Sequence, residues 1–126
     1  MELRDEVRRE MTLLRERIPD VEGSIACSVD GLPIASDVNG AADEIGALSS
    51  ALLALSRRMT GLAGKGSFEE TLISGTHGYA ALYAAGPKIV LTVLARPGAN
   101  LGLLRLEGRK TAANLAAITS RTWTTQ

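Results

Sequence analysis

Apolar residues recur at intervals of three and four over residues 2–18, which predicts an amphipathic helix with one narrow apolar stripe. The stripe consists of Leu3, Val7, Met11, Leu14 and Ile18. Most of the other positions are charged, and Pro19 ends the helix because proline cannot continue its hydrogen-bond ladder.

The pattern then changes to that of extended chain. Residues 23–29 (GSIACSV) and 32–36 are predicted as two strands, joined by a tight turn at Asp30-Gly31. Pro33 lacks a backbone N–H, so the second of these strands should lie at an edge of the sheet.

A second helix is predicted over residues 42–62, and it carries two different faces. The first is a leucine seam, in which apolar residues alternate at intervals of three and four as in a heptad repeat. The leucine seam consists of Ile45, Leu48, Leu52, Leu55, Met59 and Leu62. The second is a small-residue face, which consists of Gly46, Ser49, Ser50, Leu53 and Arg57.

The small-residue face has two interpretations. Small side chains let another backbone approach closely, as at tight helix pairs, but they also occur as plain helix filler. Leu53 favours the first interpretation, because it would otherwise be stranded on the outer side of the helix. We therefore predict that this face is the contact between two copies of the chain.

Three more strands are predicted at residues 68–74, 79–84 and 88–95, with turns short enough for an antiparallel meander. The last two strands are apolar without alternation, so helices should cover both faces of the sheet. A third helix follows over residues 100–119.

The order α-β-β-α-β-β-β-α predicts an α+β fold, and no internal repeat or domain boundary interrupts it. We expect one domain spanning residues 1–126. Its core should cover residues 6–119, and residues 120–126 should form a flexible tail.

Composition removes most classes of chemistry. Lys and Arg together number 14, as do Asp and Glu, and the balance disfavours nucleic acid as a partner. One Cys and one His cannot form a disulfide, a zinc site or a defensible catalytic pair. The first ten residues, MELRDEVRRE, lack the apolar segment of a signal peptide, so we expect a cytoplasmic protein that does not insert into membranes. No cofactor or metal is expected.

The charges are sorted along the chain although they cancel. Between Arg17 and Arg57 every charge is acidic, whereas from Lys88 onward all but Glu107 are basic. Such asymmetry can orient a partner, or it can simply describe solvated faces.

Several residues resemble functional motifs without meeting their requirements. Residues 61–67 (GLAGKGS) lack the spacing of a phosphate-binding loop and follow a helix, so we interpret them as a helix end. His77 is predicted in a surface turn. Glu69 and Glu70 should point to opposite faces of a strand and not act as a pair. No catalytic residue is predicted, and Arg57 and Arg58 are the candidate partner-binding residues at the rim of the helix.

Three segments resemble the roadblock/dynein light chain family, and in particular bacterial members encoded beside small Ras-like GTPases in gliding-motility and conservon operons. The segments are GSIACSVDGLPIAS, DEIGALSSALLALSRRM and KIVLTVLARPGANLGLLRLEGRKTAANLAAI. The resemblance implies a sandwich with a five-stranded antiparallel sheet, the first and third helices on one face and the second on the other. It also implies homodimers in which the second helices pair and the third strands join, which adds Phe68 and Thr71 to the predicted interface.

The resemblance further implies an adaptor or regulator that modulates the nucleotide cycle or location of a small Ras-like GTPase and is not itself an enzyme. Other signalling proteins of the same operon, and recruitment to a membrane through a partner, belong to the same expectation. The alternative is a profilin-like small-molecule sensor or scaffold domain, for which a polar pocket between sheet and helices would be the distinguishing feature.

Overall fold

The computed structural model describes residues 2–124, which form three helices and five strands. In chain order the elements are α1 (Leu3–Arg17), β1 (Val21–Ser28), β2 (Pro33–Ser36), α2 (Ala42–Leu62), β3 (Glu70–Gly75), β4 (Gly78–Ala85), β5 (Ile89–Ala95) and α3 (Leu101–Thr124). The predicted order of elements is confirmed, and the bounds of α2 agree with the prediction.

The five strands form one antiparallel sheet in the order β2-β1-β5-β4-β3. The meander of β3, β4 and β5 is confirmed, and so is the position of the Pro33 strand at an edge. The ladder between β1 and β2 is irregular at Ala26 and Cys27, so this edge strand is both short and kinked. The two free edges of the sheet therefore belong to β2 and β3.

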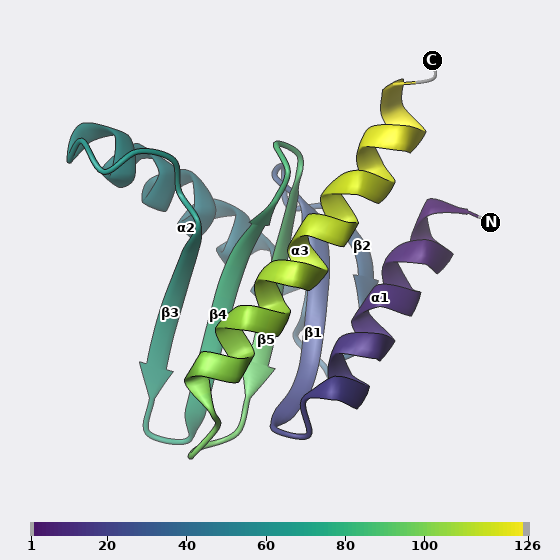
Figure 1. Ribbon diagram of the computed structural model, residues 1–126, viewed down its shortest axis with the longest axis vertical. Helices are drawn as coiled ribbons and strands as arrows, with labels where there is room; N and C mark the ends of the chain where they lie inside the picture. Colours follow the sequence, from purple (N-terminus) through teal and green to yellow (C-terminus); the bar gives the residue numbers. More distant parts are fainter. Residues whose placement is uncertain (1, 125–126) are drawn as a thin grey trace.

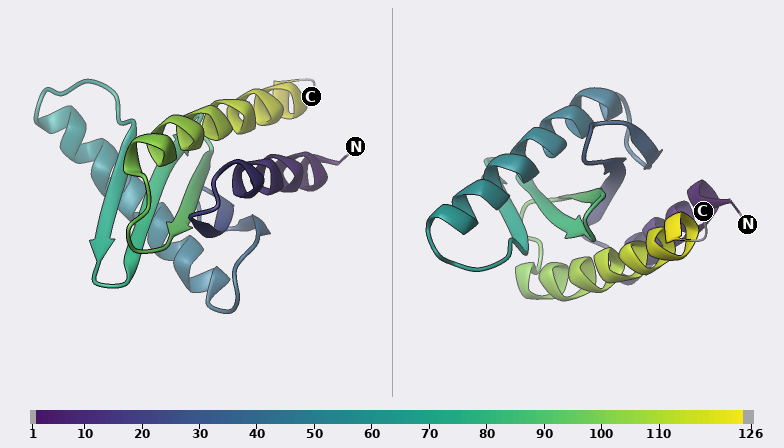
Figure 2. Two further views of the ribbon diagram at one scale, coloured as in Figure 1. Left: turned by 60° about the horizontal axis from the view of Figure 1, so that its bottom comes forward. Right: turned by 90° about the horizontal axis from the view of Figure 1, so that it is seen from above.

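Helices cover both faces of the sheet, as its apolar strands require (Figure 1). α1 and α3 lie side by side on one face, and α2 crosses the other face alone (Figure 2). Its C-terminal end projects past β3 in Figure 1, while no helix is seen to cover β3 there.

The core is divided unequally between these two layers. The larger cluster lies between the sheet and the pair α1 and α3, and includes the whole apolar stripe of α1 except Leu3, which is partly buried. The smaller cluster lies under α2 and consists of Cys27, Leu53, Leu82 and Val90. One helix thus closes one side of the sheet with very few large side chains.

α3 continues to Thr124, past its predicted end at Thr119. Most of the segment predicted as a flexible tail is thus helical in its backbone, and residues 125–126 lie outside the described part of the chain.

Candidate interaction surface

The small-residue face of α2 packs on the chain's own sheet. Gly46, Ser49, Ser50 and Leu53 are buried, and only 1% of Leu53 is exposed. The prediction that these four residues contact a second copy is wrong, because strands of the same chain already cover them. Leu53 is not stranded outside but fills the small cluster under the helix.

Hydrogen bonds explain why a helix can bury serines here. The Thr92 hydroxyl donates to Ser49 Oγ at 2.6 Å, and the Ser50 hydroxyl lies 3.0 Å from the carbonyl oxygen of Ser28. Gly46 brings the α2 backbone close to β1, where Cys27 Sγ lies 3.4 Å from its carbonyl oxygen. Burial raises the pKa of the Cys27 thiol, which suits a structural, protonated side chain.

The leucine seam is the side of α2 that faces solvent. The exposed fractions are 70% for Leu48, 63% for Leu55, 71% for Met59 and 82% for Leu62. Ile45 and Leu52 are half-buried at the margin of the seam. A contiguous row of large apolar side chains on a monomer surface is typical of a site that a partner covers.

β3 continues this surface onto the edge of the sheet. Leu72 and Ile73 are 43% and 45% exposed, although they point to opposite faces of the strand. The hydroxyls of Ser56 on α2 and Thr71 on β3 lie 3.0 Å apart, which joins the helix to the start of the strand. The seam and the β3 edge therefore form one candidate interaction surface.

The opposite edge of the sheet is protected. β2 has only four residues and includes Pro33, which cannot donate to an added strand. α1 lies against it, and Arg4 Nε donates to the carbonyl oxygen of Ile34 at 2.9 Å. Of the two edges, β3 is the one left open to another strand.

The remaining predicted interface residues lie around this surface. Phe68 is half-buried against the small cluster under α2, and Thr71 is half-buried at its bond to Ser56. Arg57 lies on the sheet side and donates to the carbonyl oxygen of Gly86 at 3.1 Å. Arg58 is exposed and lines a shallow hollow of about 550 Å³ with Leu55, Met59, Leu62 and Ala63. Of the two candidate partner-binding arginines, only Arg58 borders the leucine seam.

An ion-pair cluster ties the start of β3 to α3. Glu70 accepts from Arg105 at 2.6 Å and from Arg109 at 2.7 Å, and Arg109 also donates to Glu69 at 2.8 Å. These hydrogen bonds and charges raise the pKa of Arg109. The expectation that Glu69 and Glu70 cannot act together is wrong, because β3 begins only at Glu70 and Glu69 does not follow the strand's alternation.

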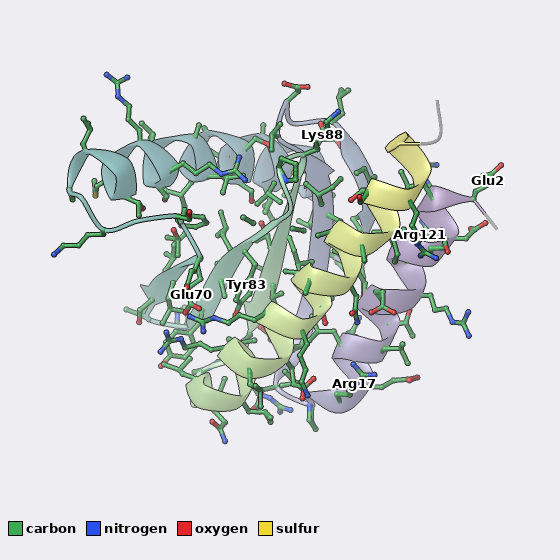
Figure 3. The ribbon with its side chains drawn as sticks, turned by 45° about the horizontal axis from the view of Figure 1, so that its top comes forward. Glu2, Arg17, Glu70, Tyr83, Lys88 and Arg121 are labelled. Atoms are coloured by element: carbon green, nitrogen blue, oxygen red, sulfur yellow. The ribbon has the colours of Figure 1, made fainter. Side chains whose placement is uncertain are left out.

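Tyr83 lies beneath this cluster on the face that α3 covers (Figure 3). Its hydroxyl donates to the carbonyl oxygen of Leu104 at 3.2 Å. Burial, followed by the charge of Glu70, raises the pKa of Tyr83 to about 12. The tyrosine is thus a neutral structural group at ordinary pH.

The described residues contain no group of three or more His, Cys, Asp or Glu that could hold a metal ion. Within the same part of the chain, no helix is both long and apolar enough to cross a bilayer. A hollow of about 280 Å³ between α3 and the sheet is lined by four alanines and Gly86, together with Phe68, Tyr83, Glu69 and Arg109.

Known proteins share this architecture. The family model of the Roadblock/LC7 domain matches residues 8–95. Two uncharacterized proteins of Methanocaldococcus jannaschii are each 36% identical to this chain over 100 residues, which cover 78% of this chain and 87% of theirs.

Solved structures agree in fold. The gliding protein MglB from Thermus thermophilus superposes with a TM-score of 0.86 at 16% identity, over 96% of this chain and 93% of that one. A Roadblock/LC7 domain from Streptomyces avermitilis gives a TM-score of 0.78 at 24% identity, over 90% of this chain and 95% of that one. The open antiparallel sheet between one helix and two, together with the family model's match to most of the sequence, shows that this chain belongs to the Roadblock/LC7 family.

Proposed function

We propose that this chain forms a homodimer that binds a small Ras-like GTPase and modulates its nucleotide cycle or location without catalysing a reaction itself. The observation that carries the proposal is the leucine seam, an apolar surface that continues into an open strand edge. Full burial of one leucine side chain contributes about 1.5–3 kcal/mol, so covering four exposed seam residues gives association a substantial driving force.

The proposed dimer interface is therefore the leucine seam together with the β3 edge, and not the small-residue face that the sequence predicted. The C-terminal half of α2 and β3 lie on the same side of the molecule, at the left in Figure 1, so a single second copy can contact both elements. A two-fold interface uses the same patch on both copies, and a seam of identical apolar type along one helix is suited to self-pairing.

The GTPase part of the proposal rests on family membership and on the fold shared with the gliding protein MglB. A regulator without its own catalytic residues acts by positioning groups of its partner. Arg58 remains the candidate contact to the GTPase, because it is exposed beside the apolar hollow at the end of α2. The protein's own location is proposed to be cytoplasmic, with any membrane recruitment supplied by a partner.

The small-molecule sensor has less support. The polar side chains that line the hollow between α3 and the sheet are already bonded within the chain: Arg109 to Glu69 and Glu70, and Tyr83 to the carbonyl oxygen of Leu104. A specific small ligand requires convergent polar groups to fix its orientation. A scaffold that uses surfaces in place of a pocket fits these residues better.

Three measurements test the proposal. Sedimentation equilibrium should give a dimer, and a pull-down with a small Ras-like GTPase of the same organism should retain the GTPase in at least one nucleotide state. GTP turnover by the mixture, compared with the GTPase alone, then shows whether hydrolysis changes. A monomer throughout the accessible concentration range contradicts the dimer, and absence of binding to the GDP-bound and GTP-bound forms contradicts the regulatory role.

A further inference from the structure

A further hollow lies beside the end of β4, next to the C-terminal part of α2. β3 pairs with β4 only as far as Glu70, which lies opposite Tyr83, whereas β4 continues to Ala85. Residues 63–69, which connect α2 to β3, pass the end of β4 without pairing with it and leave a hollow of about 510 Å³. This Arg57 hollow is lined by Arg57 of α2, residues 66–68, and Ala84, Gly86 and Pro87 around the end of β4.

Arg57 gives the hollow a positive charge that the described chain does not neutralise. Its Nη2 donates to the carbonyl oxygen of Gly86 at 3.1 Å, and it forms no ion pair with a described carboxylate. None of the described residues that line the hollow is acidic. Arg105 and Arg109, in contrast, are both bound to Glu70. Because a guanidinium carries five N–H donors, Arg57 retains donors for an anion while one hydrogen bond fixes its position.

Residues 66–68 bring further donors to the same hollow. The end of α2 uses the chain only as far as Lys65, whose backbone N–H donates to the carbonyl oxygen of Thr60 at 2.9 Å. This bond caps a carbonyl group at the negative end of the helix, which would otherwise disfavour an anion nearby. The backbone N–H groups of residues 66–68 and the hydroxyl of Ser67 form no hydrogen bond with a described residue, so a ligand can use them.

We propose that the Arg57 hollow binds a small organic phosphate. Its phosphate group contacts Arg57 and the donors of residues 66–68, because a phosphate offers three strong acceptor oxygens and a negative charge. Its organic part lies against the side chains of Phe68 and Pro87, which give the hollow an apolar wall. The volume of about 510 Å³ lies within the range of small-molecule sites and leaves room for more than the anion.

The Arg57 hollow differs from the hollow between α3 and the sheet in the state of its polar groups. There, the side chains of Arg109 and Tyr83 are already bonded within the chain. The Arg57 hollow is also distinct from the surface proposed for the second copy, because none of its lining residues belongs to the leucine seam or to β3. Binding of the phosphate therefore requires neither the homodimer nor the GTPase.

Amide chemical shifts from nitrogen–proton correlation NMR test the proposal. Phenyl phosphate is the probe, titrated at about pH 7.5, where a phosphate monoester is mainly a dianion, and at constant ionic strength. We expect saturable shifts at residues 66–68 with a dissociation constant on the order of 1 mM. Inorganic phosphate lacks the apolar part and benzoate lacks the third oxygen, so each should bind several-fold more weakly.

Three variants assign the binding to Arg57. Arg57→Gln removes the charge but keeps a side-chain N–H for Gly86, and should weaken binding by about 10- to 150-fold. Arg57→Lys keeps the charge without the planar fork, and should give an intermediate constant. Arg9→Gln makes the same change of charge at an exposed position on α1, and should stay within about 2-fold of the parent.

Each contrary result overturns a defined part of the proposal. Shifts that do not saturate, or that gather at residues outside the hollow, overturn the site. Arg57→Gln that binds as tightly as the parent overturns it as well, and if this variant does not fold, Arg57→Lys decides. Inorganic phosphate or benzoate that binds as tightly as phenyl phosphate overturns the organic phosphate as the ligand class.

Discussion

Gly108 shows how one contact can decide a residue's identity. A glycine inside a helix costs about 1 kcal/mol relative to alanine, yet α3 contains one that is buried. A Cβ at this position would lie 2.5 Å from Cζ of Tyr83, whose ring is itself only 1% exposed and cannot move aside. The close approach of α3 to β4 thus requires the glycine.

Gly108→Ala should therefore destabilise the fold by about 1–3 kcal/mol, because overpacking outweighs the gain in helix propensity. Gly102→Ala is the matched control in the same helix. Gly102 is exposed, and a Cβ there would meet only Asn100 Oδ1 at 3.5 Å, so the substitution should be neutral or stabilise by up to about 1 kcal/mol. Urea unfolding of both variants measures the difference, and equal effects would contradict the assignment.

Tyr83 gives the stability a specific alkaline dependence. Its pKa rises from about 10 in the unfolded chain to about 12 in the fold. The folded state therefore holds its proton over a range in which the unfolded state releases it. The resulting stabilisation is complete below pH 10 and is lost as the pH rises toward 12, by about 1.4 kcal/mol per pH unit.

Tyr83→Phe should flatten this dependence above pH 10, at the cost of the hydrogen bond to Leu104, about 1 kcal/mol near neutral pH. Urea midpoints of both proteins measured from pH 8 to 11 test this expectation. If the urea midpoints of both proteins fell equally above pH 10, groups other than Tyr83 would account for the loss of stability.

At the scale of the element, the buried face of α2 contributes to the stability of the fold, and its exposed face is the one proposed to associate with a second copy. Leu53 is buried against the sheet and Leu55 is 63% exposed, although they are two residues apart. Leu53→Ala should lower the free energy of unfolding by about 2–5 kcal/mol, because it leaves a cavity beneath the helix. Leu55→Asp should keep the fold and weaken self-association, because it places a charge in the leucine seam.

Circular dichroism with urea unfolding and sedimentation equilibrium separate the two effects. Arg9→Asp introduces a carboxylate on α1, far from α2, and should change neither property by much. A dimer of Leu55→Asp as tight as that of the parent would remove the leucine seam from the interface.

The sequence was sufficient to predict the existence and order of these elements, because periodicity and turn residues determine them locally. It was also sufficient to identify both faces of α2, but not to decide which one faces inward. A rule that apolar residues lie inside assigns the leucine seam to the core. The structure reverses this, because only small side chains let α2 approach β1 and β5, and Ser49 and Ser50 find hydrogen-bond partners there.

The cluster of Glu69, Glu70, Arg105 and Arg109 was missed for a related reason. Its acidic residues lie 35 to 40 residues from the arginines that they bind, and their proximity depends on how α3 crosses β4. Tyr83 beneath them carries no local signal of its own. Long-range contacts of this kind follow from the packing of layers, which the pattern along the chain does not encode.

At the scale of the whole molecule, several of the sorted charges pair with one another inside the fold. Arg96 from the basic C-terminal half pairs with Asp20 at 3.1 Å, and Arg105 and Arg109 bind the acidic start of β3. These ion pairs hold elements of the fold together, so the charge asymmetry along the sequence is not by itself evidence of a docking field. Six of the eight exposed large apolar residues of the described chain lie in the leucine seam and on β3, and the other two are Leu32 and Leu106.

If covering that surface requires a second copy, thermal stability must depend on protein concentration, because association stabilises only the folded chain. A 100-fold dilution across the range where the dimer is fully formed should lower the Tm by about 4–8 °C for a chain of this size. Leu55→Asp, which disrupts the seam, should melt at a temperature that does not change with dilution. Differential scanning calorimetry at several concentrations compares the two proteins. A Tm of the parent protein that is independent of concentration would show that the seam stays uncovered, and its four highly exposed apolar side chains would then have to be covered by a different partner.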